Sequence, residues 1–150
     1  MELQVRVTRW PNGQLKEQYP YYVDAEAREK RHGIAEAWYE NGKRKGQWRW
    51  VHGKRNGTFI VWRSDGTVAS IGCFKEDQPH DVFKSWRRDG RLESETEYRE
   101  GHLIQGEFFS ATGELVSTVQ EGSGEQIDYH DNGVQMCEIM WKDGLEAKSR

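Results

Sequence analysis

Residues 57–66 read Gly-Thr-Phe-Ile-Val-Trp-Arg-Ser-Asp-Gly, and this stretch predicts one strand followed by one tight turn. Its first half, Phe59 to Trp62, consists of aromatic and β-branched residues, which fit a pleated surface. Asp65 and Gly66 are residue types that adopt the positive φ angles of a hairpin turn. The stretch therefore predicts the first strand of a β-hairpin and its turn.

The same pattern recurs along the whole chain. The turn glycines are 29, 24, 24, 23 and 20 residues apart, at Gly13, Gly42, Gly66, Gly90, Gly113 and Gly133. The residue nine positions before the turn is Gly33, Gly57, Asp81 or Gly124. The residue eight positions after it is Trp50, Phe74, Tyr98 or Trp141. Such self-similarity is typical of repeat proteins, so the sequence predicts about six hairpins.

Composition favours a thin sheet over a thick two-layer core. The chain has 7 Trp, 6 Tyr and 5 Phe, and each aromatic side chain buries more area than a valine. In a repeat array each unit covers only its neighbours. We therefore expect about twelve short strands in one twisted antiparallel sheet, with little or no helix. Trp38, Trp62 and Trp86 are expected to stack in a column.

The chain is expected to be one repeat domain at residues 1–145, followed by a polar tail at residues 146–150. Residues 20–32 form its longest interruption and allow two interpretations. In the first, Asp24 caps a short helix that reaches Lys30. In the second, which is favoured, the segment is a hairpin loop with solvated charges, because seven residues are too few for an unpacked helix.

Charged residues are segregated although the net charge is only −3. Residues 41–63 contain no acid and seven bases, which are Lys43, Arg44, Lys45, Arg49, Lys54, Arg55 and Arg63. Residues 100–141 contain no Lys or Arg and eight acids, which are Glu100, Glu107, Glu114, Glu121, Glu125, Asp128, Asp131 and Glu138. Each block is either a solvated face or a docking surface for a partner of opposite charge. The uncompensated acidic block favours docking.

No catalytic constellation is recognisable in the sequence. It has no nucleophile elbow, and no Gly-rich phosphate loop precedes a helix. Most of the five histidines lie beside repeat glycines, which predicts a surface column of histidines rather than a metal site. Cys73 and Cys137 lack the clustered spacing of a zinc site. We therefore expect a protein that is not an enzyme and has no cofactor or metal.

Targeting signals are equally sparse. No stretch approaches the roughly 20 apolar residues that span a bilayer. The residues that follow Met1 lack the apolar core of a signal peptide. The sequence therefore predicts a cytoplasmic protein.

The chain resembles the bacterial variant of MORN repeats, through Trp-Tyr-Glu-Asn-Gly-Lys at 38–43, His-Gly at 32–33 and Gly-x-Phe-x-x-Trp-x-x-Asp-Gly at 57–66. More narrowly, it resembles the YwqK-like antitoxin family over roughly residues 1–145. It departs from the pattern at Asp77 and Asp81, which replace glycines, and in a shortened unit at 106–113. The resemblance implies an elongated, single-layer antiparallel meander of stacked hairpins. It also implies an antitoxin or immunity protein that acts on a bacterial toxin.

The predicted function is non-catalytic binding of a protein partner, in which the chain neutralises a toxin by direct contact and binds no nucleic acid. MORN-type scaffolding or binding to anionic phospholipid is the alternative. The residues expected to contact the partner are Glu107, Glu125, Asp128, Asp131, Lys43, Arg44, Lys45, Arg49, Lys54 and Arg55. The sequence leaves open the toxin's chemistry, the sheet face that binds and the oligomeric state.

Overall fold

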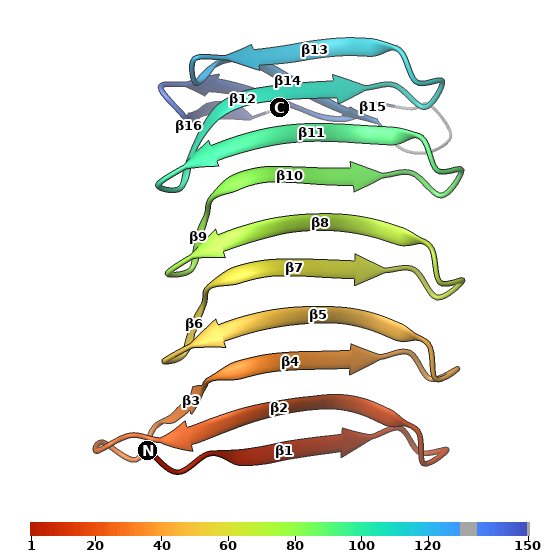
Figure 1. The fold of residues 1–150 in the computed structure, drawn as a ribbon. Helices are drawn as coiled ribbons and strands as arrows, with labels where there is room; N and C mark the ends of the chain where they lie inside the picture. Colours follow the sequence, from red (N-terminus) through yellow and green to blue (C-terminus); the bar gives the residue numbers. More distant parts are fainter. Residues whose placement is uncertain (130–134, 150) are drawn as a thin grey trace. The chain divides into compact units, whose positions relative to one another are not determined.

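The computed structural model describes residues 1–129 and 135–149, which form strands joined by turns (Figure 1). The strand pairings within these residues are antiparallel and follow chain order. This confirms the predicted all-β meander of hairpins. The described residues include no helix long and apolar enough to cross a membrane.

The structure assigns sixteen strands to the described residues. The first eight are β1 (Gln4–Arg9), β2 (Leu15–Val23), β3 (Glu29–Arg31), β4 (Gly33–Trp38), β5 (Arg44–Val51), β6 (Lys54–Arg55), β7 (Gly57–Trp62) and β8 (Val68–Lys75). The others are β9 (Gln78–Pro79), β10 (Asp81–Trp86), β11 (Leu92–Arg99), β12 (His102–Phe109), β13 (Leu115–Gln120), β14 (Ser123–Tyr129), β15 (Gln135–Lys142) and β16 (Leu145–Ser149).

The chain divides into two compact units, each of which is described by itself. Unit 1 comprises Met1–Val68 with Phe74–Asp77, and unit 2 comprises Ala69–Cys73 with Gln78–Arg150. Within unit 1, six residue pairs join the strands of the β1–β2 hairpin and six join those of the β4–β5 hairpin. Only two pairs join β2 to β4. The long hairpin is therefore the building block, while the predicted single domain stays a prediction.

One end of each long hairpin is closed by a predicted turn glycine. Gly13, Gly42, Gly66, Gly90 and Gly113 have φ angles of 90°, 87°, 93°, 89° and 91°. Each glycine N–H donates to the carbonyl three residues earlier, as Gly42 does to Tyr39 at 2.9 Å. These five predicted turns are confirmed, and the sixth turn glycine, Gly133, lies outside the described residues.

The opposite ends carry two-residue turns in which both residues have positive φ, the geometry of type I′ hairpins. They lie at residues 52–53, 76–77, 100–101, 121–122 and 143–144. The first residue of each has φ between 49° and 52°, and the second between 69° and 83°. Asp77 adopts φ 69° at a position where the other turns have glycine. The aspartate therefore leaves the turn geometry intact.

These type I′ turns also join consecutive hairpins. The N–H of the second turn residue donates to a carbonyl of the preceding repeat, from Gly53 to Arg31 at 2.8 Å and from Asp77 to Arg55 at 2.9 Å in unit 1. Unit 2 repeats the bond from Gly101 to Pro79, from Gly122 to Ile104 and from Gly144 to Gly122. In the first three bonds the acceptor, Arg31, Arg55 or Pro79, lies two residues before the residue that begins the next long strand.

A sharp change of direction follows each short strand in the first repeats. Gly33, Gly57 and Asp81 begin β4, β7 and β10 with φ angles of 124°, 118° and 62°. They separate those strands from the short strands β3, β6 and β9. The corresponding position in the shortened unit is Gly106, where the two parts merge into one strand, β12. The shortened unit at 106–113 therefore lacks the break between a short and a long strand that the first repeats have.

The aromatic stacking differs from the predicted column. Trp38 and Trp62 are half-buried, and their rings do not contact each other within unit 1, all of whose residues are described. The strand register shifts at Trp38, and such a bulge turns a side chain away from the regular alternation. Ring contacts form elsewhere in each unit, between Phe59 and Phe74 at 5.4 Å and between Phe83 and Tyr98 at 5.1 Å.

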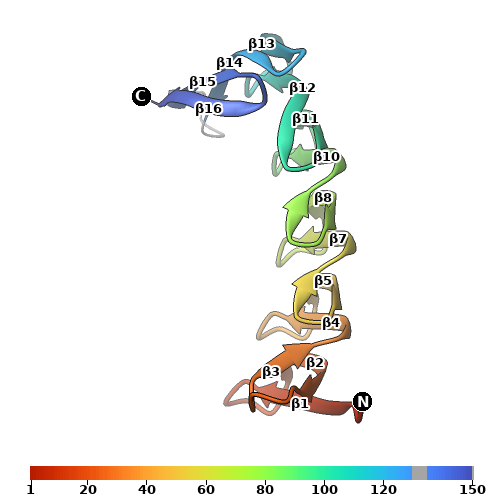
Figure 2. The same cartoon turned by 90° about the vertical axis from the view of Figure 1, so that its left-hand side faces the viewer.

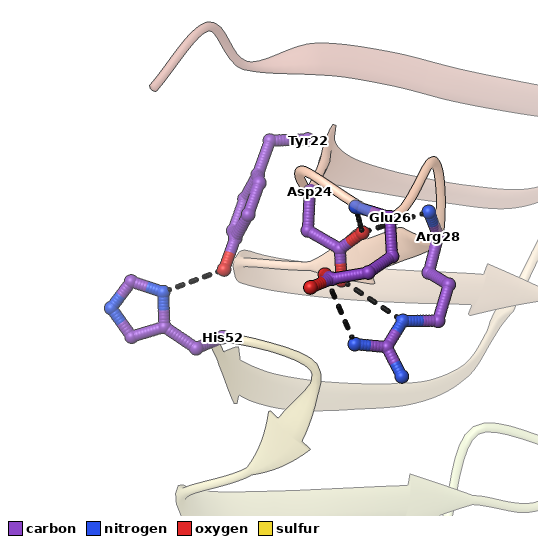
Figure 3. Close-up of polar contacts among 5 residues, drawn as sticks. All are labelled: Tyr22, Asp24, Glu26, Arg28 and His52. Atoms are coloured by element: carbon purple, nitrogen blue, oxygen red, sulfur yellow. Dashed lines mark hydrogen bonds and ion pairs between the residues drawn. The ribbon is translucent and has the colours of Figure 1, made fainter.

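Residues 20–32 form a short hairpin, not a helix. β2 continues to Val23 and pairs with β3. The carboxylate of Asp24 accepts the backbone N–H groups of Glu26 and Arg28 at 3.0 and 2.9 Å (Figure 3). The capping ability of aspartate thus stabilises a turn, as it does in Asx motifs. The favoured hairpin-loop interpretation is confirmed.

The end of the chain also differs from expectation. Residues 145–149, most of which were assigned to a polar tail, form β16, which pairs with β15 through Trp141 and Glu146 among others. Backbone pairing does not require apolar side chains, so a polar segment can close a sheet.

A first prediction concerns Gly46, whose Cα lies under the indole of Trp48. A Cβ at this position would overlap the Trp48 ring. Gly46→Ala should therefore lower the free energy of unfolding by about 1–3 kcal/mol. In a Trp48→Ala background the same change should be neutral or stabilising, because alanine restricts the unfolded chain. Urea denaturation of the four proteins measures both effects, and equal losses in the two backgrounds would contradict this packing.

A second prediction concerns Glu29, which joins three strands. Its carboxylate accepts the Tyr19 hydroxyl at 2.7 Å and pairs with Arg6 at 2.7 Å. The hydrogen bond from Tyr19, followed by that from Arg6, lowers the pKa of Glu29. A lowered folded-state pKa contributes stability above the ordinary value, about pH 4.3, and loses it as the pH falls through the folded-state value.

Glu29→Gln should therefore destabilise the protein at pH 7, and the difference from wild type should shrink in acid. The loss at pH 7 should not exceed about 1 kcal/mol, because 35% of the side chain is exposed. Denaturation of wild type and Glu29→Gln at pH 7 and at pH 3 measures the difference in their free energies of unfolding. A difference that stays constant between the two would show that the carboxylate charge is not involved.

Candidate interaction surface

A groove of about 510 Å³ opens on one face of unit 1. Two tryptophans, three cations and several carboxylates line it, among them Trp48, Trp50, Arg31, Arg55, Lys45 and Glu36. We call this hollow the Trp groove. Aromatic residues and arginine are enriched at protein interfaces, so the groove is the candidate interaction surface.

Small residues create the hollow. Ala35 lies directly opposite Trp48 in the β4–β5 hairpin, and Ala37 lies opposite Gly46. Ala35 occupies the position seven residues before the turn glycine, where the next two repeats have Phe59 and Phe83. The missing phenylalanine leaves space over β4. The groove is therefore a property of this repeat's sequence and not of the repeat pattern in general.

Arg31 and Arg55 occupy equivalent positions, two residues before Gly33 and Gly57. The guanidinium of Arg31 lies 3.8 Å from the Tyr19 ring centroid and 3.1 Å from a carboxylate oxygen of Glu17. That of Arg55 lies 4.1 Å from the Phe74 ring centroid and 3.2 Å from Asp77. Stacking and ion pairing together hold each arginine in place. The groove thus has pre-organised walls.

The Asp77 carboxylate remains a strong acceptor. Burial raises its pKa, but the backbone N–H of Arg55, at 2.7 Å, and the Arg55 guanidinium outweigh burial and leave the pKa below its ordinary value. Glu36, also in the lining, pairs with Arg44 at 3.3 Å. Most charges of the groove are therefore neutralised by partners within unit 1.

Two donors of the groove are left without acceptors. The indole Nε1 of Trp50 is buried and has no hydrogen-bond partner within the described chain. Lys45 is exposed, lies 5.8 Å from the Tyr39 ring centroid and forms no ion pair with any described residue. A buried N–H without an acceptor is unfavourable. A ligand that offers a carboxylate would pair with the exposed Lys45 ammonium group.

The predicted basic residues do not form one patch. Lys45 and Arg55 line the Trp groove. Lys43 lies in the turn at one end of the β4–β5 hairpin, and Lys54 lies beside the turn at the other end. Arg49 alternates with Trp48 and Trp50 on β5, so it lies on the opposite face.

Sequence reasoning missed the contribution of Arg31, Glu36, Trp48 and Trp50 to this surface. The signal that could have found them is the coincidence of Ala35 in a phenylalanine position with an additional tryptophan, Trp48, beside Trp50. Both departures from the repeat lie on facing strands of one hairpin.

The predicted acidic residues are only partly placed. Glu107 is exposed on β12, directly opposite Glu95, and borders a hollow of about 260 Å³ together with Glu97. Glu125 and Asp128 lie on β14, which β13 separates from β12 in the strand order. Asp131 lies outside the described residues.

The predicted histidine column is observed for two members. The rings of His32 and His52 are 4.6 Å apart, and the backbone N–H of His52 donates to Nδ1 of His32 at 3.0 Å. The Tyr22 hydroxyl contacts Nδ1 of His52 at 2.8 Å (Figure 3). The part of the chain that the structure describes contains no group of three His, Cys, Asp or Glu side chains that could hold a metal ion.

Residues 31–52 match the family model of the MORN repeat variant. No curated protein matches the chain. The matched segment contains the last residue of β3, all of β4, the turn at Gly42 and all of β5, together with most of the lining of the Trp groove. The turn geometry of this segment recurs in the hairpins that follow it. The chain therefore contains a MORN-type repeat at residues 31–52.

Proposed function

We propose that this chain is a non-catalytic protein-binding module, that its partner is a bacterial toxin, and that the Trp groove is the surface that holds the toxin. The observation that carries the proposal is the groove itself, with half-buried aromatic walls and an exposed lysine, Lys45, that has no ion pair with any described residue. The MORN-type repeat supports a scaffold or binding module in general. The resemblance of the repeat motif to the YwqK-like antitoxins supports the choice of a toxin as partner.

The residue types of the groove suit a binding hot spot. Trp and Arg are over-represented among the residues that dominate interface energies. Arg31 and Arg55 are already stacked and paired, so little side-chain freedom is lost when a partner binds. Conversely, the lining residues include no Ser, Cys or His, the usual nucleophiles and bases. These features favour binding over chemistry.

The exposed ammonium group of Lys45 defines what the toxin would present. A loop that places a carboxylate over Lys45 would pair with it. The groove accommodates only a few side chains, whereas a stable interface buries roughly 1,600 Å² in total. The remaining contacts would come from the surrounding sheet face.

Acidic residues of unit 2 would act mainly on the association rate. Glu107, Glu95 and Glu97 border one hollow, and Lys84 pairs with Glu95 at 3.2 Å. Such a negative patch attracts a basic partner over several ångströms and loses this effect in salt. A toxin with a basic active-site cleft would therefore be captured faster.

The lipid-binding alternative draws less support from the geometry. Arg44 and Arg55 are ion-paired, and Lys43 and Lys54 lie at opposite ends of a hairpin. A flat anionic surface attracts several basic groups most strongly when they face it together. The spread of these residues does not provide such a face.

A third prediction compares two lysines of the same block. Lys45 lines the groove and Lys43 lies in the nearby turn, and both are exposed, so neither change should affect folding. Lys45→Glu should weaken toxin binding about tenfold or more, because it places a carboxylate where the partner's acceptor would lie. Lys43→Glu should change affinity less than about threefold.

The test co-expresses the chain with the toxin domain encoded by a neighbouring reading frame and measures growth, then measures affinity by calorimetry with the purified proteins. Wild type and Lys43→Glu should restore growth and bind one toxin per chain. Equal affinities of the two variants would remove the Trp groove from the mechanism. Failure of the wild-type chain to restore growth or bind would remove the toxin as partner.

A further inference from the structure

Strand β1 is the first strand in the hydrogen-bonded order of the sheet. β2 lies on one side of it, and no described strand pairs with the other side (Figures 1 and 2). An unpaired edge offers a row of backbone donors and acceptors to another strand. Such edges are commonly protected by proline or by charged residues that point inward.

Pro20 shows which backbone groups of β1 face outward. Pro20 has no N–H, and its carbonyl accepts the N–H of His32 at 3.0 Å, on the side away from β1. Val5 lies directly opposite Pro20, so this is a pair without hydrogen bonds. The N–H and carbonyl of Val5 therefore point to the free edge. By alternation, those of Val7 point the same way.

The residues with outward backbone groups also carry exposed aliphatic side chains. Leu3, Val5 and Val7 are 51%, 60% and 43% exposed. They alternate with polar residues, so their side chains share one face of the sheet. The edge thus presents backbone hydrogen-bonding groups and an apolar row on the same residues.

The sequence of β1 is complementary to itself in one antiparallel register. Pairing Val5 with Val5 of a second copy places Leu3 opposite the second copy's Val7 and Gln4 opposite its Arg6. Every apolar residue then meets an apolar residue, and an amide meets a guanidinium. Shifting the second copy by two residues instead places Arg6 opposite Arg6, and like charges directly opposite are destabilising.

We propose that β1 is a self-assembly edge, at which two copies of this chain join their β1 strands antiparallel about a two-fold axis through the Val5 pair. The row of Leu3, Val5 and Val7 becomes continuous with that of the second copy. A pairing of about five residues buries far less than the roughly 1,600 Å² of a standard interface. The dimer should therefore be weak, with a dissociation constant on the order of 100 µM.

Sedimentation equilibrium of the full-length wild-type chain and of two single variants, Val7→Pro and Val7→Thr, tests the backbone pairing. Proline removes the outward N–H of Val7 and leaves the β1–β2 ladder intact, as it does on natural edge strands. Threonine keeps both the N–H and the shape. Val7→Pro should raise the dimer dissociation constant about tenfold or more, and Val7→Thr less than about threefold. Thermal unfolding confirms that both variants are folded.

A second pair of variants tests the register. Gln4 accepts the Tyr21 hydroxyl at 2.9 Å, and Gln4→Glu keeps that acceptor while it places a carboxylate opposite the second copy's Arg6. Gln4→Glu should tighten the dimer several-fold at low salt, and Gln4→Lys should weaken it. The opposite order would overturn the register.

Three results would overturn the proposal as a whole. The first is a wild-type chain that remains monomeric up to about 1 mM, since the expected constant lies roughly tenfold lower. The second is a series of species larger than dimers, which would indicate that β1 pairs with a different edge. The third is equal weakening by Val7→Pro and Val7→Thr, which would assign the contact to side chains alone.

Discussion

The hydrogen bond from each type I′ turn to the preceding repeat is the interaction on which the rest of the structure depends. In each case the second turn residue donates its N–H to a carbonyl 18 or 22 residues earlier in the chain. Within a two-residue hairpin this N–H has no partner of its own. The bond therefore gives this donor an acceptor and fixes the position of the next hairpin. It requires two consecutive residues at positive φ, which explains the recurrence of glycine and of Asp77.

The same bond connects the fold to the candidate interaction surface. Its acceptors in unit 1 are the carbonyls of Arg31 and Arg55, the two arginines whose side chains line the Trp groove. Their backbones are held by the repeat contact, and their guanidinium groups are held by aromatic rings and carboxylates. Asp77 contributes twice, through its backbone N–H to Arg55 and through its carboxylate to the Arg55 backbone. Repeat geometry and groove geometry are thus set by the same residues.

Sequence periodicity predicted the elements that depend on local chemistry. The turn glycines, the hairpins and the order of the meander follow from residues at fixed spacings, because turn types demand particular residues. The short strands β3, β6 and β9 and the strand β16 were not predicted, because backbone pairing of two to five residues leaves no side-chain pattern.

The Trp groove depends on Ala35 opposite Trp48, a contact between residues of different strands. The charged blocks were visible in the sequence, but their distribution over faces and ends depends on strand alternation and register.

Amide hydrogen exchange measured by NMR tests the central claim, that turn amides join consecutive repeats. The N–H groups of Gly53, Asp77 and Gly101 should exchange as slowly as amides in the middle of the adjacent strands. The preceding turn residues, Glu76 and Glu100, should exchange rapidly and serve as internal controls. Fast exchange at Gly53, Asp77 and Gly101, equal to that of the controls, would contradict the account and show that the hairpins are not joined through their turns.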